Sequence, residues 1–316
     1  MVSRAGVSTP HAVRVGPARN AQALLSSSRS KRSDNIRVRT HRIPTLLLAG
    51  CRKRRALVSS PLKIARETVG RILDRGCFWA LPGWVRSYRF PVPLEIFFVS
   101  NLEIWFIPGK GDGPTVLFCH GNSGNLRFPP ARRNRLMAIH ETGADLWVFD
   151  YRGYGRSAGS VSEAGLYEDA RIVHSAARAA HRPERPFLIF GRSLGGAVAT
   201  YLATEVQTPD CLILESTFTS APEVCAGWVG PRLADCMTYR FDSLSRIERL
   251  SCPLRMIHGG WDRVVPHRLG RKLYERFSGP KEFVTVAKAG HNNLQQVAGG
   301  LYEKVLDRWI KDSTGA

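Results

Sequence analysis

The sequence predicts an α/β fold, in which a mostly parallel central sheet carries helices on both faces. Short apolar runs alternate along the chain with longer amphipathic segments, a pattern typical of β-α-β units. Most of these apolar runs are four to six residues long and continuous, which indicates strands buried on both faces. The length of 316 residues suits one large domain of this class with an additional segment.

Apolar runs of the body of the chain are predicted to form the strands. In chain order they are Leu102–Ile107, Thr115–Cys119, Leu146–Phe149, Phe187–Phe190, Cys211–Leu214, Leu254–Ile257 and Phe283–Val286. Parallel strands end at one edge of their sheet, and the active residues of such folds gather in the loops at that edge. The residues that follow each run are therefore the ones in which chemistry is expected.

Amphipathic segments between these runs are predicted to form the covering helices. They are Ala131–Glu141, Ser162–His181, Leu194–Val206, Arg268–Phe277 and Leu294–Lys311. The segment 218–250 lies between the predicted strands Cys211–Leu214 and Leu254–Ile257 and is predicted to form a short cap. Its aromatic residues and methionine either contact an acyl chain or pack as an ordinary lid. The whole domain is assigned to residues 91–316.

The basic charge is concentrated at the amino terminus. The chain has 46 Lys+Arg and 26 Asp+Glu, a net charge of +20, and residues 1–56 alone contribute +12 with Asp34 as their one acid. Like charges at this density are costly to bury, so we predict a basic, disordered tail or a targeting segment. A transit peptide, a lipobox at Leu48–Cys51 and a twin-arginine signal at Arg54–Arg55 are the targeting alternatives.

Residues 57–90 are predicted to form a linker or an edge helix. The aromatic residues of the segment 64–90 lie among arginines, so a segment lying on a membrane surface is the alternative. Because the tail is basic, we expect peripheral contact with an anionic membrane. The expected location of the protein is the cytoplasm or a membrane surface. Specific nucleic-acid binding is not expected, because no aromatic-interleaved motif accompanies the basic residues. The seven cysteines are scattered without C-x-x-C, which indicates a reducing compartment and predicts no metal site.

The pattern G-x-S-x-G occurs twice, at Gly155–Gly159 and at Gly191–Gly195. A serine nucleophile of this type lies on a sharp turn between a strand and a helix. The copy centred on Ser193 follows the strand that ends at Phe190 and precedes a small, apolar helix start. The copy centred on Ser157 has loop sequence on both sides. Ser193 is therefore the predicted nucleophile, and Ser157 is interpreted as a turn residue.

A serine nucleophile needs a base, and in this type of sheet the base is a histidine near the end of the chain. Three histidines follow Ser193. His291 lies on a loop just past the last predicted strand, where a base is required. The alternatives are His258, interpreted as a packed loop residue, and His267, interpreted as a surface residue at a helix start.

The orienting acid is expected between the nucleophile and the base. Asp262 lies one loop after the strand that ends at Ile257, so its carboxylate could hold the tautomer of the imidazole. Glu215, directly after the strand that ends at Leu214, is the alternative. Asp150 precedes the nucleophile and is predicted to cap a loop.

The oxyanion of an acyl-transfer reaction needs two backbone donors. One is expected to be the N–H of Leu194, at the start of the helix after the turn. The other is expected from the loop His120–Asn125, whose small residues allow the backbone to approach a substrate. A phosphate-binding loop is the alternative, but the lysine of such loops is absent.

Several segments together resemble those of the α/β-hydrolases in order and spacing. They are His120–Asn125, Asp150–Gly155, Gly191–Gly196, Glu215–Phe218, His258–Asp262 and Gly290–Asn292. The resemblance runs from about Pro91 to Ile310. It is greatest for small-cap serine hydrolases with a serine-aminopeptidase-like domain, a branch that includes abhydrolase-domain lipid hydrolases and protein depalmitoylases.

This resemblance implies a serine hydrolase without metal or cofactor. Its triad would be Ser193, Asp262 and His291, with the backbone of Asn122 and Leu194 as oxyanion donors. The implied reaction is the cleavage of a carboxylic ester or thioester of a small or lipid-like acyl substrate through an acyl-enzyme. A non-catalytic binding or scaffold protein on a hydrolase fold is the alternative.

Overall fold

A mixed sheet of eight strands organises the part of the chain that the computed structural model describes, residues 61–76 and 90–313. The strands are β1 (Glu95–Val99), β2 (Leu102–Ile107), β3 (Thr115–Cys119), β4 (Asp145–Phe149), β5 (Phe187–Arg192), β6 (Cys211–Glu215), β7 (Leu254–Gly259) and β8 (Lys281–Val286). Their order in the sheet is β1-β2-β4-β3-β5-β6-β7-β8. Strands β3 to β8 are parallel, and β1 and β2 are antiparallel. The predicted α/β class is therefore confirmed.

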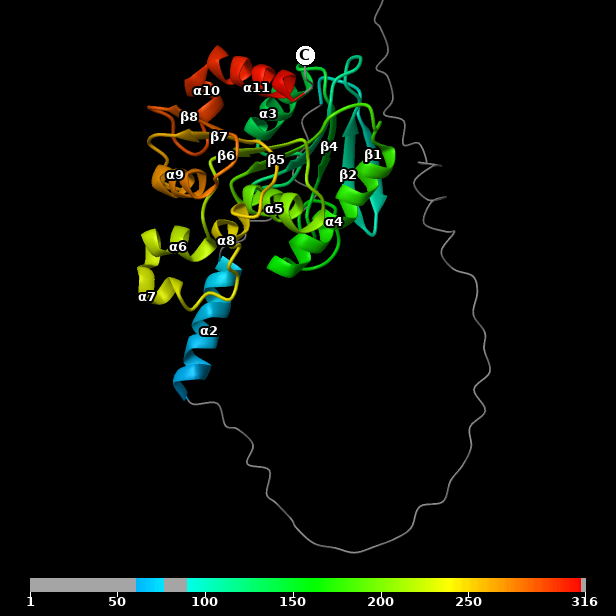
Figure 1. Cartoon of the computed structure of the whole chain (residues 1–316). Helices are drawn as coiled ribbons and strands as arrows, with labels where there is room; N and C mark the ends of the chain where they lie inside the picture. The colour runs from blue at the N-terminus through cyan, green and yellow to red at the C-terminus, as the bar shows by residue number, and fades with distance from the viewer. Residues whose placement is uncertain (1–60, 77–89, 314–316) are drawn as a thin grey trace, which may run out of the picture.

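Helices cover both faces of this sheet (Figure 1). One face carries α3 (Pro130–His140), α10 (Leu294–Ala298) and α11 (Gly300–Asp312). The other face carries α4 (Glu163–Ala180), α5 (Leu194–Tyr201) with the π-helical turn η1 (Leu202–Val206), and α9 (His267–Arg276). Each face has its own buried apolar core.

Strand β3 shows why continuous apolar runs predict these strands. All five of its residues are buried. Val116 and Phe118 belong to the core under α3 and α11, whereas Leu117 and Cys119 belong to the core under α4 and α5. Successive side chains point to opposite faces of a strand, so a strand covered on both sides has no polar positions.

Two features of the fold differ from the sequence-based expectation. Strand β1 was not among the predicted strands; it forms a hairpin with β2 through Ser100 and Asn101, whose φ angles are 49° and 65°. It is an edge strand with half-exposed residues. The single helix predicted over Leu294–Lys311 is wrong, because Gly299, with φ of 52°, ends α10 and precedes α11.

The segment predicted as a cap contains three short helices. They are α6 (Ala221–Val229), α7 (Pro231–Ala234) and α8 (Ser243–Ile247). The loop before α8 is anchored to α4, since the Glu163 carboxylate accepts from the N–H groups of Arg240 (2.6 Å) and Phe241 (2.7 Å). Helices α6 and α7 lie at one end of the molecule, beyond the sheet (Figure 1).

Helix α2 (Pro61–Gly76) packs against this cap. The Asp74 carboxylate accepts from the N–H groups of Thr238 and Tyr239, each within 3.2 Å. Gly70 lies so close to the cap that a Cβ there would be 2.0 Å from the carbonyl oxygen of Cys236. Neither α2 nor any other helix of the described residues combines the length and the apolar character needed to cross a membrane.

Candidate active site

Ser193 occupies the sharp turn between β5 and α5. Its φ of 54° and ψ of −119° lie in a region that residues other than glycine rarely adopt. The flanking glycines are required by space: a Cβ on Gly195 would lie 2.0 Å from the carbonyl oxygen of Cys119, and one on Gly191 would lie 2.4 Å from that of Gly195. The Ser193 N–H donates to the carbonyl of Glu215 (2.9 Å), which ties the turn to β6.

Three strand ends bring a histidine and a carboxylate to this serine. His291, in the loop after β8, has its Nε2 3.1 Å from Ser193 Oγ. Its Nδ1 lies 2.7 Å from Oδ2 of Asp262, in the loop after β7. The other oxygen of Asp262 accepts from the N–H groups of Val264 (2.9 Å) and Val265 (2.8 Å). The three side chains form one hydrogen-bonded row and are buried.

The surroundings favour an ionised Asp262 and a neutral His291. Burial raises the pKa of Asp262, but its hydrogen bonds with His258 and His291 outweigh burial and bring the pKa below its ordinary value. Burial and the nearby charge of Arg192 lower the pKa of His291, against the opposing pull of Asp262. A neutral imidazole beside a serine hydroxyl is able to accept its proton.

The predicted oxyanion donors lie next to the serine. Leu194 is the first residue of α5, where backbone N–H groups have no partner within the helix. Two tyrosine hydroxyls hold the loop that carries Asn122 in place: Tyr154 donates to Asn122 Oδ1 (2.8 Å), and Tyr151 donates to the carbonyl of His120 (3.0 Å). Both predicted donor residues line the same cavity as Ser193.

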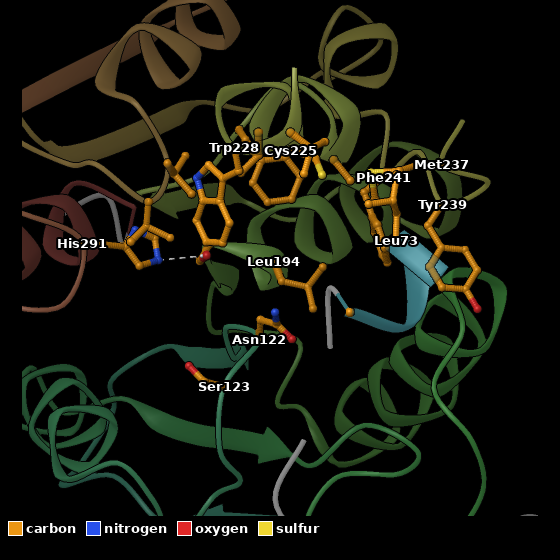
Figure 2. Close-up of a pocket in the computed structure, with 18 of the residues that line it drawn as sticks. Leu73, Asn122, Ser123, Leu194, Cys225, Trp228, Met237, Tyr239, Phe241 and His291 are labelled. Carbon is orange, nitrogen blue, oxygen red and sulfur yellow. Dashed lines mark hydrogen bonds between the residues drawn. The ribbon is translucent and has the colours of Figure 1, made fainter. Parts of the chain in front are cut away.

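That cavity has a volume of about 560 Å³ and is mostly apolar. Figure 2 shows His291, Leu194 and Asn122 at one end and the cap residues around it. The apolar wall comes from α2, from α6, and from the loops that follow β6, α7 and β7; it comprises Ile72, Leu73, Phe218, Val224, Trp228, Met237, Tyr239, Phe241 and Val265. The volume lies within the range of small-molecule sites.

The comparisons with known proteins agree with this architecture. Residues 114–235 match the family described as alpha/beta hydrolase fold. An uncharacterised protein of Mycobacterium tuberculosis, Rv2307c, is 35% identical over 216 residues, which cover 66% of this chain and 74% of that protein. The chain belongs to the α/β-hydrolase superfamily. It is a hydrolase.

Other relatives of this hydrolase have named activities. The lysophosphatidylserine lipase ABHD12 of Danio rerio is 34% identical, and the match covers 51% of this chain and 47% of that protein. Among solved structures, the Pyrococcus furiosus esterase Pf2001 superposes with a TM-score of 0.62 over 74% of this chain and 97% of that chain, at 19% identity. The latter likeness concerns the fold alone.

The alternative acid, Glu215, is placed differently in the hydrolase. Its side chain is buried and points away from His291: Oε1 accepts from Arg135 Nε (2.6 Å) and Oε2 accepts from the hydroxyl of Tyr302 (2.7 Å). Burial raises the pKa of Glu215, but the charges of Arg135 and Arg192 bring it below its ordinary value. Glu215 is therefore an ionised anchor between β6, α3 and α11.

The remaining candidates also have other partners. Ser157 donates to the carbonyl of Asp150 (2.6 Å) and accepts from the N–H of Glu103 (2.9 Å), as expected of a turn residue. His258 lies under the acid loop, with Nε2 2.9 Å from the carbonyl of Val265. His267 contacts the hydroxyl of Thr285 (3.0 Å). Within residues 61–76 and 90–313, no group of three or more His, Cys, Asp or Glu is arranged as a metal site.

Sequence reasoning missed two contributions to the site. Helix α2 supplies part of the cavity wall through Ile72 and Leu73, although it precedes the predicted hydrolase domain. The apolar residues of α2 recur at helical spacing among basic ones. This pattern predicts a helix but does not indicate which part of the protein the helix packs against. Arg192, inside the G-x-S-x-G pattern, donates to the carbonyl of His291 (2.7 Å) and so links the nucleophile turn to the loop of the base.

Proposed function

We propose that this hydrolase cleaves carboxylic esters of acyl chains with Ser193 as the nucleophile, His291 as the base and Asp262 as the orienting acid. One observation carries the proposal. The hydrogen-bonded row of the three side chains, with separations of 3.1 Å and 2.7 Å, opens on an apolar cavity of about 560 Å³. The nucleophile thus faces a space suited to an acyl chain.

In the first half of the reaction, His291 Nε2 takes the proton of Ser193 Oγ while this oxygen bonds to the carbonyl carbon of the substrate. The carbonyl oxygen becomes an oxyanion, held by the backbone N–H groups of Leu194 and Asn122. The intermediate then collapses: the bond to the alcohol breaks, and His291 returns its proton to the leaving oxygen. The acyl group remains on Ser193.

In the second half, water replaces the alcohol. His291 takes a proton from the water, whose oxygen attacks the acyl carbon, and the proton then passes to Ser193 Oγ as the acid leaves. Asp262 stays ionised throughout and stabilises the imidazolium that forms twice in the cycle. Its two bonds from the N–H groups of Val264 and Val265 keep the carboxylate oriented.

The substrate class follows from the cavity and from the relatives. The wall residues are apolar and aromatic, so a chain of methylene groups is favoured over a polar acid. An oxygen ester is preferred to the thioester that the sequence also allowed, because a named relative is a lipase.

The experiment compares the two G-x-S-x-G serines. Ser193→Ala should abolish labelling by a fluorophosphonate probe and turnover of p-nitrophenyl esters. Ser157→Ala should retain both, although it removes the hydroxyl that accepts from Glu103 N–H and so lowers the melting temperature. Labelling and turnover are measured on the same preparations as thermal unfolding.

The matched pair separates catalysis from folding. If Ser193→Ala is folded and still labelled, the nucleophile is assigned wrongly. If the parent protein is neither labelled nor active on a series of acyl esters from two to sixteen carbons, the proposal that Ser193 cleaves acyl esters is rejected.

A further inference from the structure

A second cavity, of about 290 Å³, lies beside the acyl cavity. The two share three wall residues, Ser123, Arg192 and Asn292. Arg192 precedes the nucleophile directly, and Asn292 follows the base. A molecule bound at Ser193 is therefore able to place a group in the second cavity.

Three arginines line this second cavity, and no Asp or Glu does. Arg132 and Arg135 are buried, and Arg192 is half-buried. Arg135 and Arg192 share one carboxylate, that of Glu215, at 2.6 Å and 3.5 Å. Arg132 donates to backbone carbonyls of the oxyanion loop, including that of Ser123 (2.7 Å). The walls therefore carry more positive than negative charge.

One of these guanidinium groups lacks an acceptor for a buried nitrogen. Among the described residues, Nη2 of Arg135 has no hydrogen-bond acceptor, whereas Nε of Arg192 lies 3.5 Å from Oε1 of Glu215 and forms an ion pair with it. The exposed fractions of the two side chains are only 3% and 12%. Burial and the charge of Arg135 lower the pKa of Arg192 to about 10, in spite of Glu215. A buried cation short of acceptors and of opposite charge favours an anion nearby.

A helix start adds to the positive potential. Residues Phe128, Pro129 and Ala131 line the cavity at the amino terminus of α3, a helix of 11 residues. This terminus has no capping side chain and no acidic residue in its first turn. Pro129 and Pro130 have no N–H, and the N–H of Arg132 donates to the carbonyl of Pro129 (3.0 Å), so this terminus contributes mainly its dipole, while the arginines supply full charges.

We propose that this cavity binds a phosphoryl group carried by the alcohol part of the substrate. The inference rests on the proposed function and extends it to acyl esters of phosphorylated alcohols. A phosphoryl group fits the site because guanidinium groups and helix amino termini are its common partners in proteins. Its charge of up to about −2 also offsets the positive charge of more than one arginine. Free inorganic phosphate shares this chemistry.

The test compares two esters with the same acyl chain, a 1-acylglycerol 3-phosphate and the neutral monoacylglycerol. Ala131 is half-buried in the first turn of α3 and offers a matched pair of variants. Ala131→Glu places a carboxylate among the arginines, and Ala131→Gln has the same shape without charge. We expect the ratio of kcat/KM for the phosphorylated ester to that for the neutral ester to fall at least tenfold in Ala131→Glu and to change less than threefold in Ala131→Gln.

A second measurement does not depend on these variants folding. Inorganic phosphate, titrated into the parent protein, should inhibit hydrolysis of the phosphorylated ester competitively. If phosphate instead changes turnover of the neutral ester, and the phosphorylated ester has no advantage, the site binds free phosphate.

Two outcomes would overturn the inference. One is equal kcat/KM for both esters together with no effect of phosphate. The other is an equal loss for both esters in Ala131→Glu and Ala131→Gln, which indicates a structural role for the α3 terminus. In either case, continued hydrolysis of the neutral ester and labelling of Ser193 would show that the proposed function itself still stands.

Discussion

At the scale of single residues, Asp262 and Glu215 are two buried carboxylates that differ in their partners. Asp262 bonds to His291, whereas Glu215 bonds to Arg135 and Tyr302. Asp262→Asn should lower kcat by about 10³–10⁴-fold, because the amide no longer holds the imidazole in its reactive tautomer. Steady-state kinetics on a soluble ester measure this change.

Glu215→Gln is the counterpart and should act on stability. It leaves the charge of Arg135 buried without its carboxylate, which costs about 3 kcal/mol in the free energy of unfolding. Urea denaturation measures the loss, and kcat should fall much less than in Asp262→Asn. The assignment of the acid is wrong if the larger loss of kcat belongs to Glu215→Gln.

The pH profile tests the charge beside the base. Since burial and Arg192 lower the pKa of His291, kcat/KM should fall only as the pH drops below the ordinary histidine value of about 6.5. Arg192→Met removes a positive charge that opposes protonation of His291. The acidic limb of the profile should therefore move to higher pH.

Arg192→Lys is the control, because it keeps the charge while changing the shape. Its acidic limb should stay near that of the parent protein. An equal shift in the lysine and methionine variants would mean that the hydrogen bond from Arg192 to the carbonyl of His291, rather than the charge, sets the profile.

The sequence allows the placement of residues to be predicted where their geometry is local. The serine turn is predictable because Gly191 and Gly195 are needed for close backbone contact, and His291 follows the last strand. The arginines of the second cavity were not predicted. In the sequence, nothing distinguishes Arg132 and Arg135 from the other arginines of a basic chain. Only the folded sheet brings them beside Arg192.

At the scale of elements, α2 and the cap depend on one carboxylate. Asp74→Ala would leave the N–H groups of Thr238 and Tyr239 without their acceptor, at a cost of about 1–3 kcal/mol. Because α2 forms part of the cavity wall, KM for a long-chain ester should rise several-fold, and kcat for an acetyl ester should stay within about twofold. Kinetics with both esters test this.

Glu67→Ala is the matched control, since Glu67 lies exposed on the same helix. It should change neither KM. A similar rise of KM in both variants would indicate that α2 responds to any loss of charge. The contact between Asp74 and the cap spans 164 positions of the chain, which is why periodicity alone predicts the helix and not its place.

At the scale of the whole molecule, the basic tail lies outside the described residues, and its role stays a proposal. Deleting residues 1–56 leaves α2, which begins at Pro61, in the chain. Turnover of a soluble ester should change less than about twofold, equivalent to less than ~0.5 kcal/mol. Binding to vesicles containing phosphatidylserine should weaken, because each Lys or Arg near an anionic surface contributes about 1 kcal/mol.

Co-sedimentation with anionic and with neutral vesicles measures that binding. Exposed apolar residues would remain after the deletion, among them Ile64 and Ile72 on α2 and Trp228 on α6. Any residual binding to neutral vesicles would be assigned to these residues. Unchanged binding to anionic vesicles would contradict a role for the tail, and a folded but inactive truncated protein would show that the tail completes the site.

The order in which the three side chains occur along the chain has a consequence for protein synthesis. Ser193 and its turn are made 98 residues before His291, which comes from the loop after the edge strand β8. If Ser193 reacts as proposed, a nascent chain leaves the ribosome with its serine unable to react until the far edge of the sheet has been added. Translation that stops between this turn and His291 yields a product with the turn but without the proposed base, and we expect such incomplete chains not to hydrolyse acyl esters.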